Sequence, residues 1–254
     1  MQQLAAPFLT SLAGGARFLP LIVLTPIFGG RAVPAPVRIG LACALGLLVT
    51  GLPKHPGTAP APSASFFAAE LCTGLLIALP VVFAIKGVAV VGQCLDQICG
   101  TNAIELLFPG GEDRGAPMAQ FAEMTVVLAC LSAGVHLELV RLCAGSIAAI
   151  GPGHLPSIGQ RTLAVMISSF AGAFTGGVVL GIPFLVLAIG VETAFNFAGR
   201  LAPGFHLAAE AGAVKNAASL CLLIVLWGFL CSSFTGWGWR MAGTVRLAVA
   251  AMAG

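Results

Sequence analysis

The sequence has few charged side chains. Only 8% of its 254 residues are Asp, Glu, Lys or Arg, whereas an ordinary soluble domain carries about 25%. The 12 basic and nine acidic residues are too few for the polar shell of a water-soluble protein. A soluble enzyme, a nucleic-acid-binding protein and a disordered tail are therefore excluded. The net charge of +3 indicates no nucleic-acid partner, and 58% apolar residues predict an integral membrane protein.

The motifs of catalysis and metal binding are also lacking. The sequence contains no HExxH, nucleophile elbow or phosphate-binding GKS/T loop. His136 and Glu138 are two residues apart and face different ways on a helix. Ser146 follows Gly145, but no base is evident for it. We expect no catalytic residue, no metal and no cofactor.

The eight cysteines carry no disulfide or metal pattern. Six lie inside apolar stretches, and the pair Cys94 and Cys99 lacks metal or redox spacing. We interpret the cysteines as small buried hydrophobic residues.

Long apolar runs predict an all-α membrane protein. Backbone groups in hydrocarbon must bond within their own segment, so such runs become helices. Six stretches qualify, of which the first is an uncleaved span without a signal-peptide pattern: Leu4–Phe28, Pro36–Leu52, Phe66–Val91, Met118–Val140, Thr162–Val191 and Asn216–Trp239. They predict one membrane domain over residues 1–254, with about six long helices in hairpins.

The fifth stretch has two features of its own. Its 30 uncharged residues exceed the thickness of the hydrocarbon, so we expect tilt, a kink at Pro183 or burial in protein. Gly172/Gly176 and Gly177/Gly181 are small-xxx-small pairs that permit close helix approach, although glycine is common throughout this chain.

Two connecting segments stand out. Residues 53–65 form a Pro-rich linker, since four prolines in ten residues cannot continue a helix. Gly100–Gly115 joins two apolar stretches and holds an apolar cluster before the breaker Pro109-Gly110-Gly111 and a charged tip. This segment is either a loop with a few packed residues or a re-entrant, pore-facing loop, and its residues do not decide between them.

Several ionisable residues lie in or beside the apolar stretches. They are Arg17, Glu70, Lys86, Asp96, Glu123, Glu138, Glu192 and Arg200. A proton relay needs partners on one helical face, and this spacing does not provide them; only Glu138 and Arg141 can pair locally. Pairing between helices or subunits is therefore favoured. The loops divide the basic residues six against five between the two sides, so they indicate no orientation.

Ordered landmarks along the chain resemble a known family, the T subunits of the type III secretion export gate, whose flagellar counterpart is FliR. The landmarks are Arg17-Phe18-Leu19-Pro20, Pro34, Arg38, Glu70 with Gly74, Gly134-Val135-His136-Leu137, Ser146, Gly151-Pro152-Gly153, Pro183, Glu192, Arg200, Pro203 and Lys215. Gly204, His206, Ala208 and Val214 depart from the usual pattern. These departures indicate a divergent member, of a virulence-type injectisome more than of a flagellum.

The resemblance implies a non-enzymatic, multi-pass protein of the bacterial inner membrane. Such a subunit assembles with R and S subunits into a helical channel, docks the U subunit, contacts membrane lipid and passes unfolded protein substrates. It also implies that Gly100–Gly115 plugs the closed pore, with Ile104, Glu105, Leu106, Leu107 and Phe108 facing it. Arg17, Arg38, Arg200, Lys215 and the other landmarks would serve assembly. The alternative is a small six-span secondary transporter, which predicts an internal repeat and a charge bias that the sequence lacks.

Overall fold

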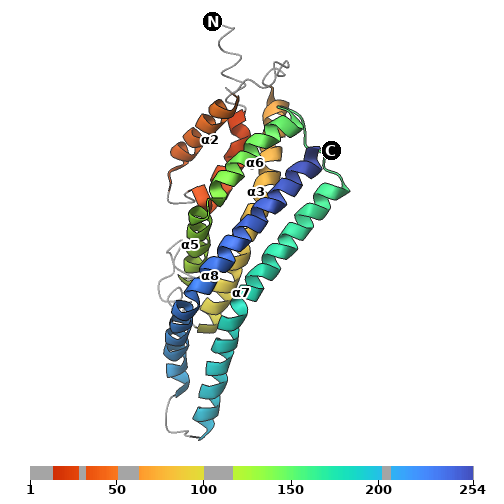
Figure 1. Ribbon diagram of the computed structural model, residues 1–254. Helices are drawn as coiled ribbons and strands as arrows, with labels where there is room; N and C mark the ends of the chain where they lie inside the picture. Colours follow the sequence, from red (N-terminus) through yellow and green to blue (C-terminus); the bar gives the residue numbers. More distant parts are fainter. Residues whose placement is uncertain (1–13, 29–32, 51–62, 100–116, 202–206, 254) are drawn as a thin grey trace. The chain divides into compact units, whose positions relative to one another are not determined.

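Figure 1 shows the computed structural model, which describes residues 14–28, 33–50, 63–99, 117–201 and 207–253. All regular structure in these ranges is helical. The elements are the helix Gly14–Leu24, η1 (Pro26–Phe28), α2 (Ala35–Thr50), α3 (Ala64–Cys99), α5 (Pro117–Ser132), α6 (Val135–Ile150), α7 (Gln160–Leu201) and α8 (Leu207–Ala253). The described part of the chain confirms the predicted all-α fold.

The chain divides into two compact units. Unit 1 comprises Met1–Ala84, Cys130–Ala171 and Trp237–Gly254, and unit 2 comprises Ile85–Ala129 and Gly172–Gly236. The helices α3, α5, α7 and α8 each contribute to both units.

The core of unit 1 follows the helical period. On α3, Phe66, Ala69, Thr73 and Ile77 are buried at three- or four-residue intervals, as expected for a helix that packs one face. The buried residues of α6 (Val135, Leu139, Cys143 and Ser146) and the C-terminal part of α8 follow the same rule. The end of α8 is bonded to the segment just before α7, because the Met252 carbonyl accepts the Ser157 N–H at 3.1 Å.

In unit 2, helices approach each other at glycines. A Cβ added to Gly87 on α3 would lie 2.7 Å from the Ala173 carbonyl oxygen, and one added to Gly177 on α7 would overlap the Gly87 carbonyl. The predicted close approach of the fifth stretch is therefore confirmed at Gly177. At Gly172 an added Cβ would meet no described atom within 4 Å, so the contacting register is Ala173–Gly177.

The fourth predicted stretch is not one helix. The segment Met118–Val140 breaks at Gly134, whose φ of 73° lies in the left-handed region that glycine adopts without strain. The axes of α5 and α6 consequently differ by 73°. By length and composition, two described helices could cross a membrane, or three if α5 and α6 form one bent span, so the predicted count of six is not confirmed.

The predicted burial of the cysteines is only partly correct. Cys130 and Cys143 are buried free thiols, whereas Cys72, Cys94 and Cys221 are exposed free thiols. The prediction is wrong for these three because their faces of α3 and α8 are not covered by other described parts of the chain. The apolar helix surface is also unevenly covered. In the most apolar stretch of α7 only 18% is buried, whereas in that of α3 59% is buried.

The glycine contact yields a paired test. We expect Gly177→Ala to lower stability by about 1–3 kcal/mol, because the new methyl group would displace the α3 backbone. Gly172→Ala should be neutral or stabilising by up to about 1 kcal/mol, since it adds helix propensity in open space. Thermal unfolding in detergent micelles measures both. Equal stability of the two variants would contradict the described packing of α3 on α7.

Candidate functional site

A fully buried ion pair lies at the centre of unit 1. The side chains of Arg17, on the helix Gly14–Leu24, and Glu70, on α3, are 0% and 1% exposed. Their contact is bidentate: Arg17 Nε donates to Glu70 Oε2 at 2.7 Å, and Nη2 donates to Oε1 at 2.9 Å. Paired N–H···O bonds of this kind fix both distance and orientation.

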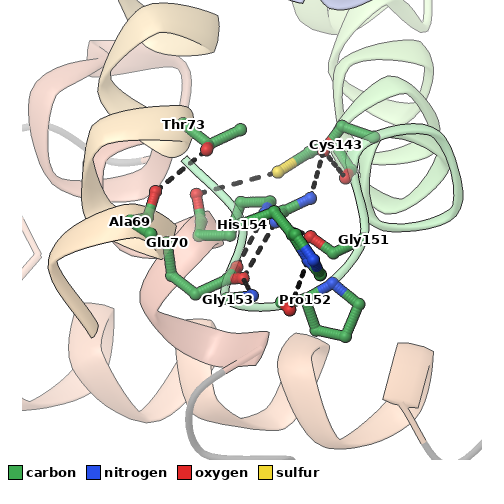
Figure 2. A network of polar contacts seen from close by, with 10 residues as sticks. Ala69, Glu70, Thr73, Cys143, Gly151, Pro152, Gly153 and His154 are labelled. Atoms are coloured by element: carbon green, nitrogen blue, oxygen red, sulfur yellow. Dashed lines mark hydrogen bonds and ion pairs between the residues drawn. The ribbon is translucent and has the colours of Figure 1, made fainter. Parts of the chain in front are cut away.

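The remaining polar atoms of the pair are bonded to α6 and the turn after it. Arg17 Nη1 donates to Ser146 Oγ at 3.3 Å, and Nη2 also donates to the Gly151 carbonyl at 3.1 Å. The Gly153 N–H donates to Glu70 Oε1 at 2.7 Å. Figure 2 shows Glu70 facing the turn Gly151–His154 across this network. One ion pair thus joins the helix Gly14–Leu24, α3, α6 and the turn.

Local sequence allows these groups to meet. Gly74 lies one turn beyond Glu70, and a Cβ there would overlap the Arg17 carbonyl oxygen, so only glycine permits this approach. Gly151 and Gly153 have φ of 79° and 74°, in the left-handed region. They let the chain turn back so that one carbonyl faces Arg17 and one N–H faces Glu70.

The contacts of this centre connect four segments of the chain. Arginine stays protonated in proteins, so it cannot transfer protons as a general acid or base. Ser146 Oγ accepts from Arg17 and donates to the Cys143 carbonyl at 2.6 Å, which leaves it no base to activate it as a nucleophile. The described residues contain no group of three His, Cys, Asp or Glu side chains that could hold a metal. We therefore interpret the centre as a buried clamp, which we call the Arg17–Glu70 clamp.

Unit 2 has polar contacts of its own. Lys86 on α3 pairs with Glu123 on α5 at 2.8 Å. Asp96, fully buried near the end of α3, accepts the N–H groups of Met118 and Ala119 at 3.1 and 3.0 Å. A carboxylate at this position satisfies unpaired donors of the first turn of α5 and complements its dipole. The expected pairing between helices is confirmed here and at the clamp.

Some signature residues contribute to unit 1 outside the clamp. The Pro34 carbonyl accepts the N–H groups of Val37 and Arg38, in the first turn of α2. Arg38 Nη1 donates to the Val23 carbonyl at 3.3 Å, near the end of the helix Gly14–Leu24. The buried Arg38 Nε and His136 Nδ1 have no hydrogen-bond partner among the described residues.

The other predicted residues lie on α7 or α8, or outside the described residues. Pro183 lies inside α7, and Glu192 and Arg200 are exposed on the same helix. Lys215 belongs to α8, but the placement of its side chain, like Pro203 and the plug candidates Ile104, Glu105, Leu106, Leu107 and Phe108, lies outside the described residues.

The predicted local pair of Glu138 and Arg141 is confirmed at 3.7 Å. Sequence reasoning missed its second partner, Arg246 on α8, which bonds Glu138 Oε1 at 2.7 Å. It also missed the partnership of Arg17 with Glu70. The only sequence signal for that contact was Gly74, one turn after the carboxylate.

Two described helices are long and apolar enough to cross a membrane, and a buried ion pair connects one of them, α3, to the helix Gly14–Leu24. These are features of an integral membrane protein with a buried polar centre. A family model described as "Bacterial export proteins, family 1" matches residues 8–238, and the chain belongs to this family. It is also 26% identical over 221 residues to the flagellar biosynthetic protein FliR of Escherichia coli K12, covering 82% of each chain. FliR of Pectobacterium carotovorum is 26% identical over 193 residues, covering 74% of this chain and 72% of its own.

The clamp yields a stability test. We expect Arg17→Met to cost about 3–5 kcal/mol, because it leaves the Glu70 carboxylate buried without its cation. The double variant Arg17→Met/Glu70→Leu should be more stable than the single variant, since no buried charge then lacks a partner. Unfolding in detergent micelles measures this difference.

Lys86→Met is the matched control. It breaks an ion pair whose lysine is 56% exposed, so it should change stability by less than about 1 kcal/mol. If Arg17→Met were as mild as Lys86→Met, the clamp would not hold unit 1 together.

Proposed function

We propose that this chain is a non-enzymatic subunit of a type III secretion export gate. It assembles with R and S subunits into a helical channel in the bacterial inner membrane, docks the U subunit and passes unfolded proteins. The observation that carries the proposal is the family match over residues 8–238, together with flagellar relatives aligned over most of the chain. The departures after Pro203 favour a virulence-type system.

The exposed apolar surface supports assembly. On α7, large apolar residues are exposed at intervals of three or four, including Leu163, Ile167, Phe170, Phe174 and Val178. These side chains are at least 36% exposed, although Phe170 also contacts Phe83. Contiguous exposed apolar patches are rare in monomeric soluble proteins and typically mark protein–protein or membrane contacts. Sister subunits and lipid can cover this apolar stripe. Such cover would replace the charged surface that the sequence lacks.

The ionic contacts support a rigid frame around the pore. The Arg17–Glu70 clamp holds three helices and a turn without acid–base chemistry, as a passive channel wall requires. Asp96 fixes the end of α3 to the start of α5. These two ends flank the proposed plug segment Gly100–Gly115, so its two anchoring points lie close together.

The plug is a soft apolar seal in this proposal. A closed gate must block ions yet yield to a polypeptide, and bulky apolar residues between glycines meet both demands. We expect deletion of Ile104–Phe108 to raise the ion conductance of the assembled complex in planar bilayers. Deletion of Gly110–Arg114, five residues of the same segment without the apolar cluster, is the matched control and should leave the gate closed. Conductance at the wild-type closed level after the first deletion would refute the plug.

Assembly is tested by co-purification. The wild-type chain should be recovered with R- and S-type subunits in a large complex. Arg200, exposed in the last turn of α7, is proposed to pair between subunits, so Arg200→Ala should reduce that recovery, whereas Arg161→Ala, an exposed arginine of unit 1, should not. Recovery of the wild-type chain alone would favour the secondary transporter.

A further inference from the structure

The two units differ strongly in charge. Unit 1 contains eight of the 12 basic residues and two of the nine acidic residues, so its formal charge is +6. Unit 2 contains the other four basic and seven acidic residues, so its formal charge is −3. Glu70 is already paired with Arg17. Glu138 is therefore the one other acidic residue in unit 1 that can neutralise its remaining basic residues. The excess of positive charge on unit 1 favours the binding of an anionic partner.

Two exposed arginines of unit 1 meet at Glu138. Arg246 bonds Glu138 Oε1 and Arg141 lies 3.7 Å from Oε2, yet the arginine side chains are 71% and 76% exposed. The carboxylate between them is only 16% exposed. One carboxylate cannot neutralise two guanidinium groups, and each guanidinium has five N–H donors. Arg141 and Arg246, with Glu138 between them, therefore carry a net positive charge and keep N–H donors exposed on the surface.

Exposed apolar side chains flank these arginines. Leu137 lies one turn before Arg141 on α6, and Leu247 follows Arg246 on α8; they are 54% and 60% exposed. Trp239, 52% exposed, lies seven residues before Arg246, which is close to two full helical turns and so places it on the same face. We call Leu137, Glu138, Arg141, Trp239, Arg246 and Leu247 the arginine patch.

We propose that the arginine patch binds the headgroup of an anionic phospholipid. Guanidinium groups bind phosphate through paired, charge-assisted hydrogen bonds, and basic sites between membrane helices are known to suit anionic headgroups. An acyl chain explains the apolar side chains beside the cations, which an inorganic anion would leave uncovered. A tryptophan on the same face is typical of the membrane–water interface. The inference goes beyond the export function and does not depend on it.

The test uses the full chain, purified in neutral detergent with whatever subunits accompany it. Thermal unfolding is followed while phosphatidylglycerol, phosphatidylcholine or inorganic phosphate is added. Phosphatidylglycerol should raise the unfolding temperature by mass action, and the other two should not. The variant Arg141→Gln/Arg246→Gln should weaken the apparent affinity for phosphatidylglycerol about 30-fold, which corresponds to about 1 kcal/mol for each arginine.

Further variants separate lost binding from lost folding. Glu138→Gln frees both guanidinium groups and should strengthen phosphatidylglycerol binding, a gain that misfolding does not produce. Adding Glu138→Gln to the double variant removes the unpaired carboxylate and should bind as weakly as the double variant. Lys86→Gln, which removes an exposed cation from unit 2, should bind as the wild type does.

Three results would overturn the proposal. Equal stabilisation by phosphatidylglycerol and phosphatidylcholine would show that the headgroup charge is irrelevant. An equal effect of inorganic phosphate would indicate a free-anion site. Unchanged lipid binding by the double variant, with loss of a co-purifying subunit, would assign the patch to an acidic segment of a partner protein.

Discussion

The structure of unit 1 depends on placing one arginine and one glutamate where water cannot reach them. Arg17 and Glu70 are stable there because each remaining polar atom of the pair is directed at a defined partner: Ser146, the Gly151 carbonyl or the Gly153 N–H. Removing both ions from water costs several kcal/mol, and only near-ideal geometry offsets that cost. The clamp therefore specifies a single arrangement of the segments that carry it, and small displacements of any one segment would be penalised.

In unit 2, helices α3 and α7 approach each other at glycines, as the helix Gly14–Leu24 and α3 do at Gly74 in unit 1. Gly87 and Gly177 bring the α3 and α7 backbones into contact, and the carboxylate of Asp96 bonds the first turn of α5. Many of the large apolar side chains on the described helices are exposed. Much of the outer surface is consequently apolar, as a subunit of a membrane assembly requires.

Sequence patterns predicted the local features well. The all-α fold, the pairing of Glu138 with Arg141 and the close approach at Gly177 each depend on residues near one another in the chain or on one helix. Contacts between segments that are distant in the chain could not be predicted from these patterns. Arg17 and Glu70 are 53 residues apart, and periodicity within one helix carries no information about which other helix will lie opposite. The break at Gly134 was missed because apolar composition continues across it.

The sequence by itself determined that this chain is an apolar helical membrane protein, because its composition leaves no other environment stable, and its ordered landmarks pointed to the export family. Apart from the local pair of Glu138 and Arg141, only the tertiary structure decided which charges are paired internally and which remain outside. Arg17 and Arg246 are both arginines in or near apolar segments, yet one is enclosed and the other is exposed. That difference arises from packing: burial is a property of how several helices meet, and it cannot be read from the residues of one of them.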